Sequence, residues 1–152
     1  MGWHGADLYV HTTDDGLAGW RRGSTPLSHA EQADVAISRS GEWLVVHYHW
    51  ETGPELEDGP WTALPTAGRL IATRYSSVSD VYTFELLDGG RPVRSFVWSE
   101  RELVEQEGAP LAEEAGLDWP EQPEDELFTL VDRLTGVPEP AHHDLTWYPL
   151  LA

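Results

Sequence analysis

The sequence predicts an α+β fold, in which an antiparallel sheet of about five to seven strands is packed by one main C-terminal helix. Stretches rich in Val, Ile, Tyr and Trp alternate with short turns that contain glycine, which is typical of antiparallel strands. After Trp98 the strand pattern stops, and helical spacing is clearest beyond Pro123. The 152 residues have the length of one ordinary domain and contain no internal repeat, so a single domain over 1–152 is expected.

The first strands are predicted in the N-terminal third of the chain. Leu8 and Val10 alternate with polar neighbours, as on a half-buried strand. A hairpin follows, in which residues 34–38 and 42–50 pair around the short turn Arg39-Ser40-Gly41. Both segments are rich in the β-branched and aromatic residues that favour strands.

A meander of three strands is predicted next. It covers residues 70–75, 81–87 and 92–98, and Asp88-Gly89-Gly90 forms the second of its turns. Pro92 suits the start of a strand, because a proline there removes no hydrogen bond from the interior of the sheet.

Two helices are predicted after the meander. A Ser-x-x-Glu capping box begins the first at Ser99, and Gly108 ends it. The second, longer helix has Pro123 at its first position, acidic residues in its first turn, apolar residues at helical spacing and Gly136 at its end. The aromatic tail over 145–148 is either a last strand or a clasp against the sheet.

Composition excludes several classes of function. The chain has no cysteine, which rules out a disulfide framework, a thiolate metal site and a cysteine nucleophile. All nine basic residues are Arg, so no lysine is present to form a Schiff base. No serine lies in a Gly-rich nucleophile elbow, and neither a phosphate-binding loop nor a dinucleotide-binding fingerprint occurs. We therefore assign no catalytic residues, and the alternative of a small-molecule-binding enzyme rests on His47 and His49.

The net charge of −18 favours a basic protein as the partner and disfavours nucleic acid and anionic membranes. The alternative is that the acidity serves solubility alone. The use of Arg without any Lys, together with the abundance of Ala, Gly, Pro, Asp, Glu and Trp, is typical of GC-rich coding, as in actinobacteria. Because the chain shows neither a signal peptide nor an apolar stretch long enough to span a bilayer, we expect a cytoplasmic location.

One pattern indicates a metal site. His47, His49 and Glu51 alternate along a predicted strand, so their side chains would share one face, and this donor set suits zinc, iron or another divalent ion. The alternative is that both histidines are ordinary residues on the less buried face of the hairpin, together with Trp43 and Val45.

The segment from Gly41 to His49, a glycine followed after five residues by His-x-His, resembles the opening of the first cupin motif. The resemblance implies a cupin-like β-rich metalloprotein with one divalent ion, in which Glu51 or Glu55 completes the ligands. The chain departs from the family in the spacing of the following Glu and Gly, and it lacks the second motif.

The C-terminal third carries a second resemblance. The stretch Gly108-Ala109-Pro110-Leu111-Ala112-Glu113-Glu114, followed by Asp118 and an acidic helix, resembles uncharacterised actinobacterial small domains, some of them similar to immunity proteins. The resemblance implies a non-catalytic protein that works by binding another protein. The alternative is that the stretch from Gly108 to Glu114 is a structural corner that ties the helix to the sheet. The candidate contacts are Glu113, Glu114, Asp118, Glu124, Asp125 and Glu126, with Trp119 as an aromatic anchor.

A third hypothesis is a metal-free pocket for an apolar small molecule. The eight Trp residues supply enough large aromatic surface for such a pocket, and its candidate lining is Trp43, Trp50, Trp61 and Trp98.

Overall fold

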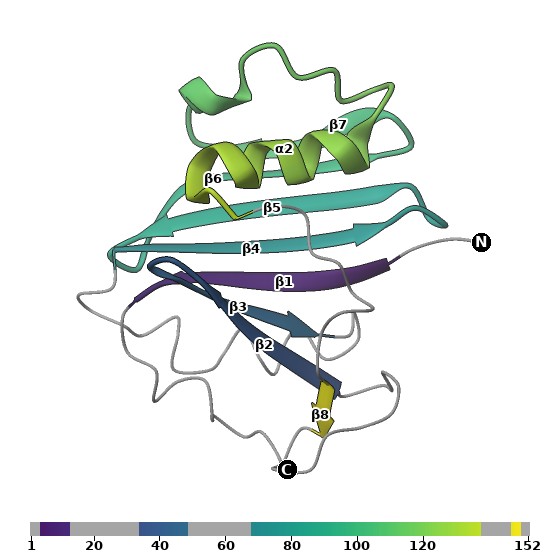
Figure 1. The fold of residues 1–152 in the computed structure, drawn as a ribbon. Coiled ribbons are helices and arrows are strands. Elements are labelled where there is room, and N and C mark those ends of the chain that lie inside the picture. Colours follow the sequence, from purple (N-terminus) through teal and green to yellow (C-terminus); the bar gives the residue numbers. More distant parts are fainter. Residues whose placement is uncertain (1–3, 13–33, 49–67, 138–146, 150–152) are drawn as a thin grey trace.

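A computed structural model describes residues 4–12, 34–48, 68–137 and 147–149 of the chain. These residues form one antiparallel sheet with the strand order β7-β6-β5-β4-β1-β3-β2-β8 (Figure 1). The strands are β1 (His4–His11), β2 (Asp34–Ser40), β3 (Trp43–Tyr48), β4 (Arg69–Ser76), β5 (Val81–Asp88), β6 (Arg91–Ser99), β7 (Glu102–Glu107) and β8 (Trp147–Pro149). A short 3₁₀ helix, η4 (Ala112–Glu114), and the helix α2 (Pro123–Thr135) follow β7.

The antiparallel sheet and the C-terminal helix of the predicted α+β fold are both present. The described sheet has seven strands of six residues or more, and the three-residue β8 is an eighth. The predicted tail strand is confirmed over residues 147–149, where β8 pairs with β2, while residues 145 and 146 lie outside the described part. No helix among the described residues is both long and apolar enough to cross a membrane.

Both predicted hairpins turn on glycine, but the first turn lies at Gly41-Glu42 and not at Arg39-Ser40-Gly41, because Arg39 and Ser40 pair with β3. Gly41 has a φ of 60°, and the turn Gly41-Glu42 joins β2 to β3 with Ser40 opposite Trp43. Gly89 and Gly90 have φ values of 60° and 81° and join β5 to β6. Positive φ at the first central residue of the Gly41-Glu42 turn, and at both central residues of the Gly89-Gly90 turn, matches the right-handed twist of a hairpin, and glycine adopts it without steric cost.

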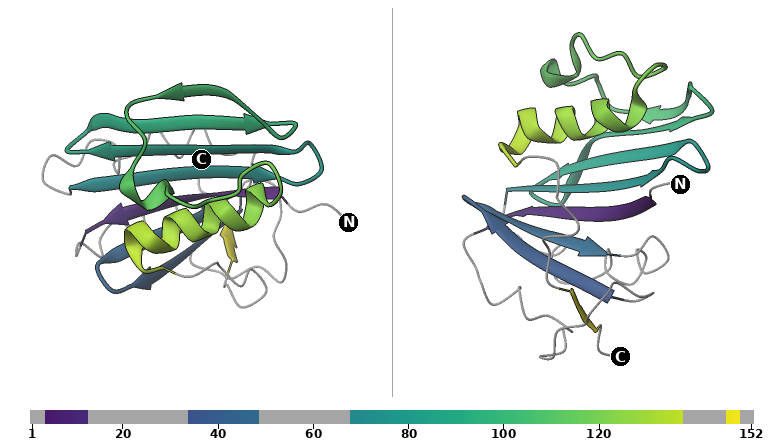
Figure 2. Two further views of the ribbon diagram at one scale, coloured as in Figure 1. Left: turned by 90° about the horizontal axis from the view of Figure 1, so that it is seen from above. Right: turned by 45° about the vertical axis from the view of Figure 1, so that its right-hand side comes forward.

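The helix α2 begins and ends where the sequence places it. Pro123 occupies its first turn, and Gly136 ends it in the left-handed conformation, with its N–H donating to the Asp132 carbonyl over 2.7 Å. Figure 2 shows α2 lying across one face of the sheet. Its buried residues belong to the same hydrophobic cluster as strand residues from that face, and these residues are Leu127, Phe128, Leu130 and Val131.

The two faces of the sheet have separate hydrophobic clusters. On the α2 face, Tyr9, Ile71, Tyr75 and Phe84 are buried, and the ring centroids of Tyr75 and Phe128 lie 5.1 Å apart. On the opposite face, strands β1, β3 and β4 contribute a smaller cluster, which consists of Ala6, Leu8, Val10, Leu44, Val46 and Leu70. This segregation follows from the two-residue period of the strands.

The predicted helix after Ser99 is wrong. Glu100 and Arg101 have φ values of 52° and 67°, and they turn the chain back into β7, which pairs with β6. Gly108 does not end a helix; its Cα packs so closely on β6 that a Cβ there would overlap the carbonyl oxygen of Val93. The capping-box pattern misled because β7 is a charged edge strand, and its residues lack the alternation of a half-buried strand.

Candidate functional site

The acidic residues of the C-terminal third gather at one end of the molecule, remote from β8. They come from β7, from the loop that contains η4, and from the first turn of α2, which lie together at the top of Figure 1. We call this end of the molecule the acidic end and define it by Glu102, Glu105, Glu107, Glu113, Glu114, Asp118, Glu121, Glu124, Asp125 and Glu126.

Arg94 on β6 organises the acidic end from within. Its side chain is only 4% exposed, and its Nε and Nη2 donate to the two carboxylate oxygens of Glu114, each over 3.0 Å. Its Nη1 lies 3.1 Å from Gln106 Oε1 and 3.1 Å from the Gly108 carbonyl. A buried guanidinium needs such partners, and its planar fork fits a carboxylate in two places. Arg94 thus joins β6, β7 and the η4 loop.

Two of the predicted partner contacts have internal roles. Glu114 is bound by Arg94 and also accepts a hydrogen bond from the backbone N–H of Leu111 over 2.6 Å. Glu126 accepts one from the backbone N–H of Asp118, also over 2.6 Å. These carboxylates hold the loop between β7 and α2 in place, so their removal would change its shape as well as its charge.

Trp119 is not an exposed aromatic anchor. Its exposed fraction is 7%, its ring stacks on Trp98 at 5.8 Å between centroids, and it meets the edge of Phe96 at 5.1 Å. Burial of a large aromatic ring against other aromatics stabilises the fold and withdraws the ring from a partner. The neighbouring Leu117 packs against the same cluster. In the sequence, the two apolar residues Leu117 and Trp119 close together within an acidic loop indicate that this part of the loop is buried.

The remaining predicted contacts keep surface positions. Asp118 and Asp125 are exposed, whereas Glu113 and Glu124 are half-buried. The sequence prediction missed the exposed carboxylates of β7, which are Glu102, Glu105 and Glu107, because it placed a helix there. It also missed Arg94, whose position on a strand gave no sign of its role.

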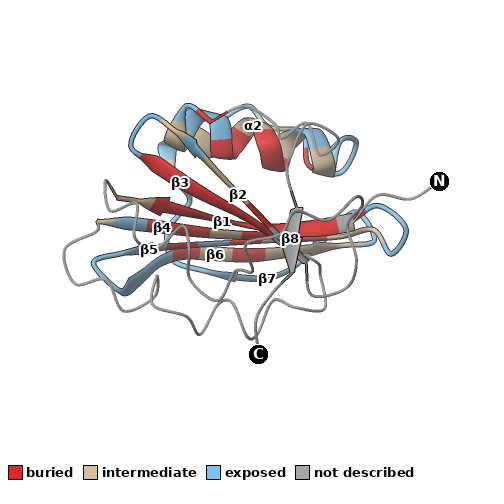
Figure 3. Ribbon diagram, turned by 60° about the horizontal axis from the view of Figure 1, so that its bottom comes forward, coloured by how far each residue is buried: buried red, intermediate tan, exposed pale blue. Residues whose placement is uncertain are grey.

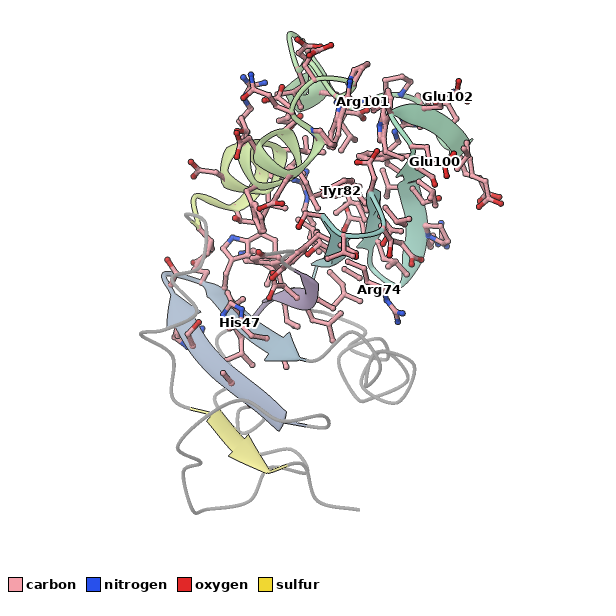
Figure 4. All side chains as sticks on the ribbon, turned by 90° about the vertical axis from the view of Figure 1, so that its right-hand side faces the viewer. His47, Arg74, Tyr82, Glu100, Arg101 and Glu102 are labelled. Carbon is pink, nitrogen blue, oxygen red and sulfur yellow. The ribbon has the colours of Figure 1, made fainter. Side chains whose placement is uncertain are left out.

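Carboxylates of the acidic end also affect the pKa of a buried tyrosine, Tyr82. Tyr82 lies between the sheet and α2 (Figure 4). Burial, reinforced by the carboxylates of Glu124, Asp80 and Asp125, raises the pKa of Tyr82 to about 12. Negative charges disfavour a phenolate, so Glu124 and Asp125 of the acidic end add to the effect of burial.

A second polar group lies in the core between β1, β2 and β3. His47 Nδ1 is 2.7 Å from Asp7 Oδ1, and His47 Nε2 is 3.3 Å from Ser38 Oγ. Asp7 and His47 are opposite each other in the strand register and are both buried. On β4, the hydroxyl of Tyr75 also interacts with Asp7, and burial together with the Asp7 charge raises the Tyr75 pKa.

This arrangement bears on the predicted metal site. Both ring nitrogens of His47 face protein partners, and His49 and Glu51 lie outside the described residues. No group of three side chains suited to a metal gathers within the part of the chain that the structure describes. The expectation that Trp43, Val45 and His47 form a less buried face is wrong, because all three are at most 8% exposed.

The tryptophans proposed for an apolar pocket, where described, have other contacts. Trp43 lies 4.9 Å from the ring of His11, and Trp98 stacks on Trp119. Trp50 and Trp61 lie outside the described residues. The two described rings therefore fill space within the fold, as large aromatic side chains commonly do.

An open trough of about 690 Å³ lies on the sheet face opposite α2, over strands β4 to β7. Thr83, Ser95 and Val97 contribute to its lining. Its ionisable groups are three carboxylates, from Glu85, Glu105 and Glu107, and the guanidinium of Arg74. Figure 4 shows Arg74 directed away from α2, toward this side of the sheet. The trough continues the negative character of β7 onto the second face.

Comparison of the chain with protein-family models, with curated proteins and with solved structures gave no match.

Proposed function

We propose that this chain is a non-catalytic protein that binds a basic protein partner through its acidic end, in the manner of an immunity or regulatory protein. The observation that carries the proposal is the gathering of exposed carboxylates from three separate elements at one end of the molecule, with Asp118 and Asp125 beside α2 and Glu105 of β7 on the opposite face of the sheet. Solubility alone requires net charge but does not require it to converge.

The internal order of the surface also supports binding. Arg94 fixes Glu114, and Glu126 fixes the backbone at Asp118, so the exposed carboxylates stand on a defined framework. A surface that is ordered before binding loses less conformational entropy when a partner docks. The concentration of one sign of charge further accelerates encounter with a basic protein, and this effect weakens as salt screens it.

The experiment compares two double variants that raise the net charge equally. Asp118→Arg/Asp125→Arg changes the acidic end, and Glu42→Arg/Asp88→Arg changes exposed acids elsewhere on the described surface. Each protein is immobilised and exposed to a lysate of the source organism at about 50 mM and about 500 mM salt, and retained proteins are identified and then purified for calorimetric titration.

We expect a basic protein whose dissociation constant rises by about tenfold or more in the acidic-end variant and by about twofold or less in the control. Equal weakening in both variants would mean that net charge alone matters, and equal affinity in all three proteins would remove the acidic end from recognition. Either result would overturn the proposal. Circular dichroism of each variant checks that the fold is retained.

A further inference from the structure

The strand β7 differs in its exposure from strands β1 to β6. All six of its residues, Glu102–Glu107, are exposed, and it is the terminal strand of the sheet. It pairs with β6 on one side, and no described element pairs with its outer side. Figure 3 shows β7 as a continuous exposed band along the sheet margin. Such an edge presents backbone donors and acceptors to which another strand can pair.

Exposed apolar side chains accompany this edge. Four large apolar residues are exposed in the described part of the chain, and three of them lie on β6 or β7: Val93, Leu103 and Val104, at 39%, 37% and 53%. The fourth, Val78, is in the turn between β4 and β5. Apolar contact area next to a free edge is what an added strand would cover.

The two sides of β7 offer different surroundings to an added strand. Glu105 and Glu107 pair with Val97 and Ser95 and line the trough on the face away from α2. Leu103 pairs with Trp98 and belongs to the α2 face. Because side chains of a strand alternate between faces, every second residue of an added strand would meet the carboxylates of the trough.

The negative charge of β7 determines which kind of strand can pair with its edge. A second copy of the chain, paired edge to edge, would bring the glutamates of two β7 strands together, and like charges on adjacent strands are destabilising. An extended segment with basic residues at alternate positions would instead place them beside Glu105 and Glu107. The carboxylates therefore act against self-association and complement a basic strand.

We propose that β7 is a docking edge for an extended basic segment of the partner, which adds to the sheet as a further strand with its basic side chains over the trough. This inference rests on the proposed function and specifies how the partner is held. The C-terminal end of β7 is already fixed by Arg94, whose Nη1 donates to Gln106 Oε1, so the edge is ordered in advance.

The probe is the peptide Val-Arg-Val-Arg-Val-Arg, acetylated at its N-terminus and amidated at its C-terminus. Two further versions carry N-methyl groups on backbone amide nitrogens, one version on those of the arginines and the other on those of the valines. All three have the same charge. In an added strand the amides of one residue type face β7 and those of the other face solvent, so only one methylated set blocks the pairing. Binding is measured by calorimetry up to about 1 mM peptide and by amide chemical shifts of ¹⁵N-labelled protein.

We expect the unmodified peptide to bind and to shift the amide signals of residues 102–107. One methylated peptide should lose about tenfold or more in affinity, and the other should stay within about threefold. The variant Glu105→Arg/Glu107→Arg should weaken the unmodified peptide by about tenfold, whereas Glu42→Arg/Asp88→Arg, with the same net charge, should have little effect.

Two outcomes would overturn strand addition. One is equal binding of all three peptides, which would indicate attraction by charge alone. The other is no binding of the unmodified peptide, or amide shifts elsewhere than β7. Neither outcome touches the proposed function, which depends separately on the response of the protein partner to Asp118→Arg/Asp125→Arg.

Discussion

His47 on β3 donates a hydrogen bond from Nδ1 to Asp7 Oδ1 on the adjacent strand β1 over 2.7 Å, and both side chains are almost completely buried. The register of β1 and β3 places the two residues directly opposite each other. A carboxylate in this position depends on its neighbours to replace the water that burial removes. The pair is therefore a structural requirement of the centre of the sheet.

We predict that His47→Ala lowers the free energy of unfolding by about 3–5 kcal/mol, because it leaves Asp7 buried without its charge-assisted hydrogen bond. His11→Ala is the control, since His11 also bonds to a carboxylate, that of Glu42, but at an exposed position, and it should cost at most about 1 kcal/mol. Urea denaturation of both variants measures the difference. Equal losses of unfolding free energy in the two variants would show that burial does not increase the contribution of the Asp7–His47 pair to stability.

The same contacts predict that His47 binds no metal in the folded protein. Its two ring nitrogens face Asp7 and Ser38, and a metal ion would have to displace one of them. Metal analysis of protein purified without a histidine tag should therefore give the same content for wild type and for His47→Gln. A near-stoichiometric metal that disappears in the variant would contradict the prediction and revive the cupin-like alternative, with His49 and Glu51 as further ligands.

The stability of the protein should fall between pH 10 and pH 12. Burial and nearby carboxylates raise the pKa of Tyr82 from 10.0 to about 12, so the folded state holds this proton more tightly than the unfolded state does. The resulting stabilisation is complete below pH 10 and is lost as the pH rises through the folded pKa. Tyr82→Phe should flatten this dependence in denaturation curves collected across that range. An unchanged slope in the variant would show that Tyr82 does not contribute.

Arg94→Lys should destabilise the acidic end although it conserves the charge. A lysine cannot make the two-pronged contact with Glu114 while also reaching Gln106, so we expect a loss of about 2 kcal/mol in unfolding free energy. Hydrogen exchange should accelerate over residues 106–118. The matched change Arg133→Lys affects an exposed residue that bonds to two carbonyls of the η4 loop, and it should cost less than about 1 kcal/mol. A smaller effect at Arg94 than at Arg133 would refute the role assigned to Arg94.

How far the sequence predicted the structure depended on whether a residue's surroundings are local. The turn glycines Gly41, Gly89 and Gly90 and the ends of α2 were predictable, because turns and helix caps are formed by neighbouring residues. The roles of Arg94 and Trp119 were not, since Arg94 bonds to residues 12 and 20 positions away and Trp119 packs on Phe96 and Trp98 of β6, more than 20 positions earlier in the chain.

The candidate sites divide in the same way. Alternation correctly placed His47 on a strand, but it could not show that Asp7, 40 residues away in sequence, lies beside it. The acidic character of the C-terminal third could be read from composition. The edge strand within it could not, because Glu-Leu-Val-Glu-Gln-Glu has neither helical nor strand periodicity and takes its structure from pairing with β6.

Gly108→Ala should disrupt the end of β7, whereas the matched substitution Gly116→Ala should not. Gly108 and Gly116 have nearly the same φ, 80° and 79°, so the backbone strain of an alanine is about 1–2 kcal/mol at each position. At Gly116 no atom lies within 4 Å of the added Cβ, whereas at Gly108 the Cβ would overlap the Val93 carbonyl oxygen and push β7 away from β6. We therefore expect Gly108→Ala to cost at least about 1 kcal/mol more than Gly116→Ala in unfolding free energy, as measured by urea denaturation, and the amides of residues 102–107 to exchange faster.

Because the docking edge proposed above requires β7 in place, Gly108→Ala should also weaken binding of the unmodified Val-Arg-Val-Arg-Val-Arg peptide, while Gly116→Ala should leave its affinity unchanged. Equal costs for the two substitutions would mean that β7 tolerates displacement and that the contact between Gly108 and β6 does not position it.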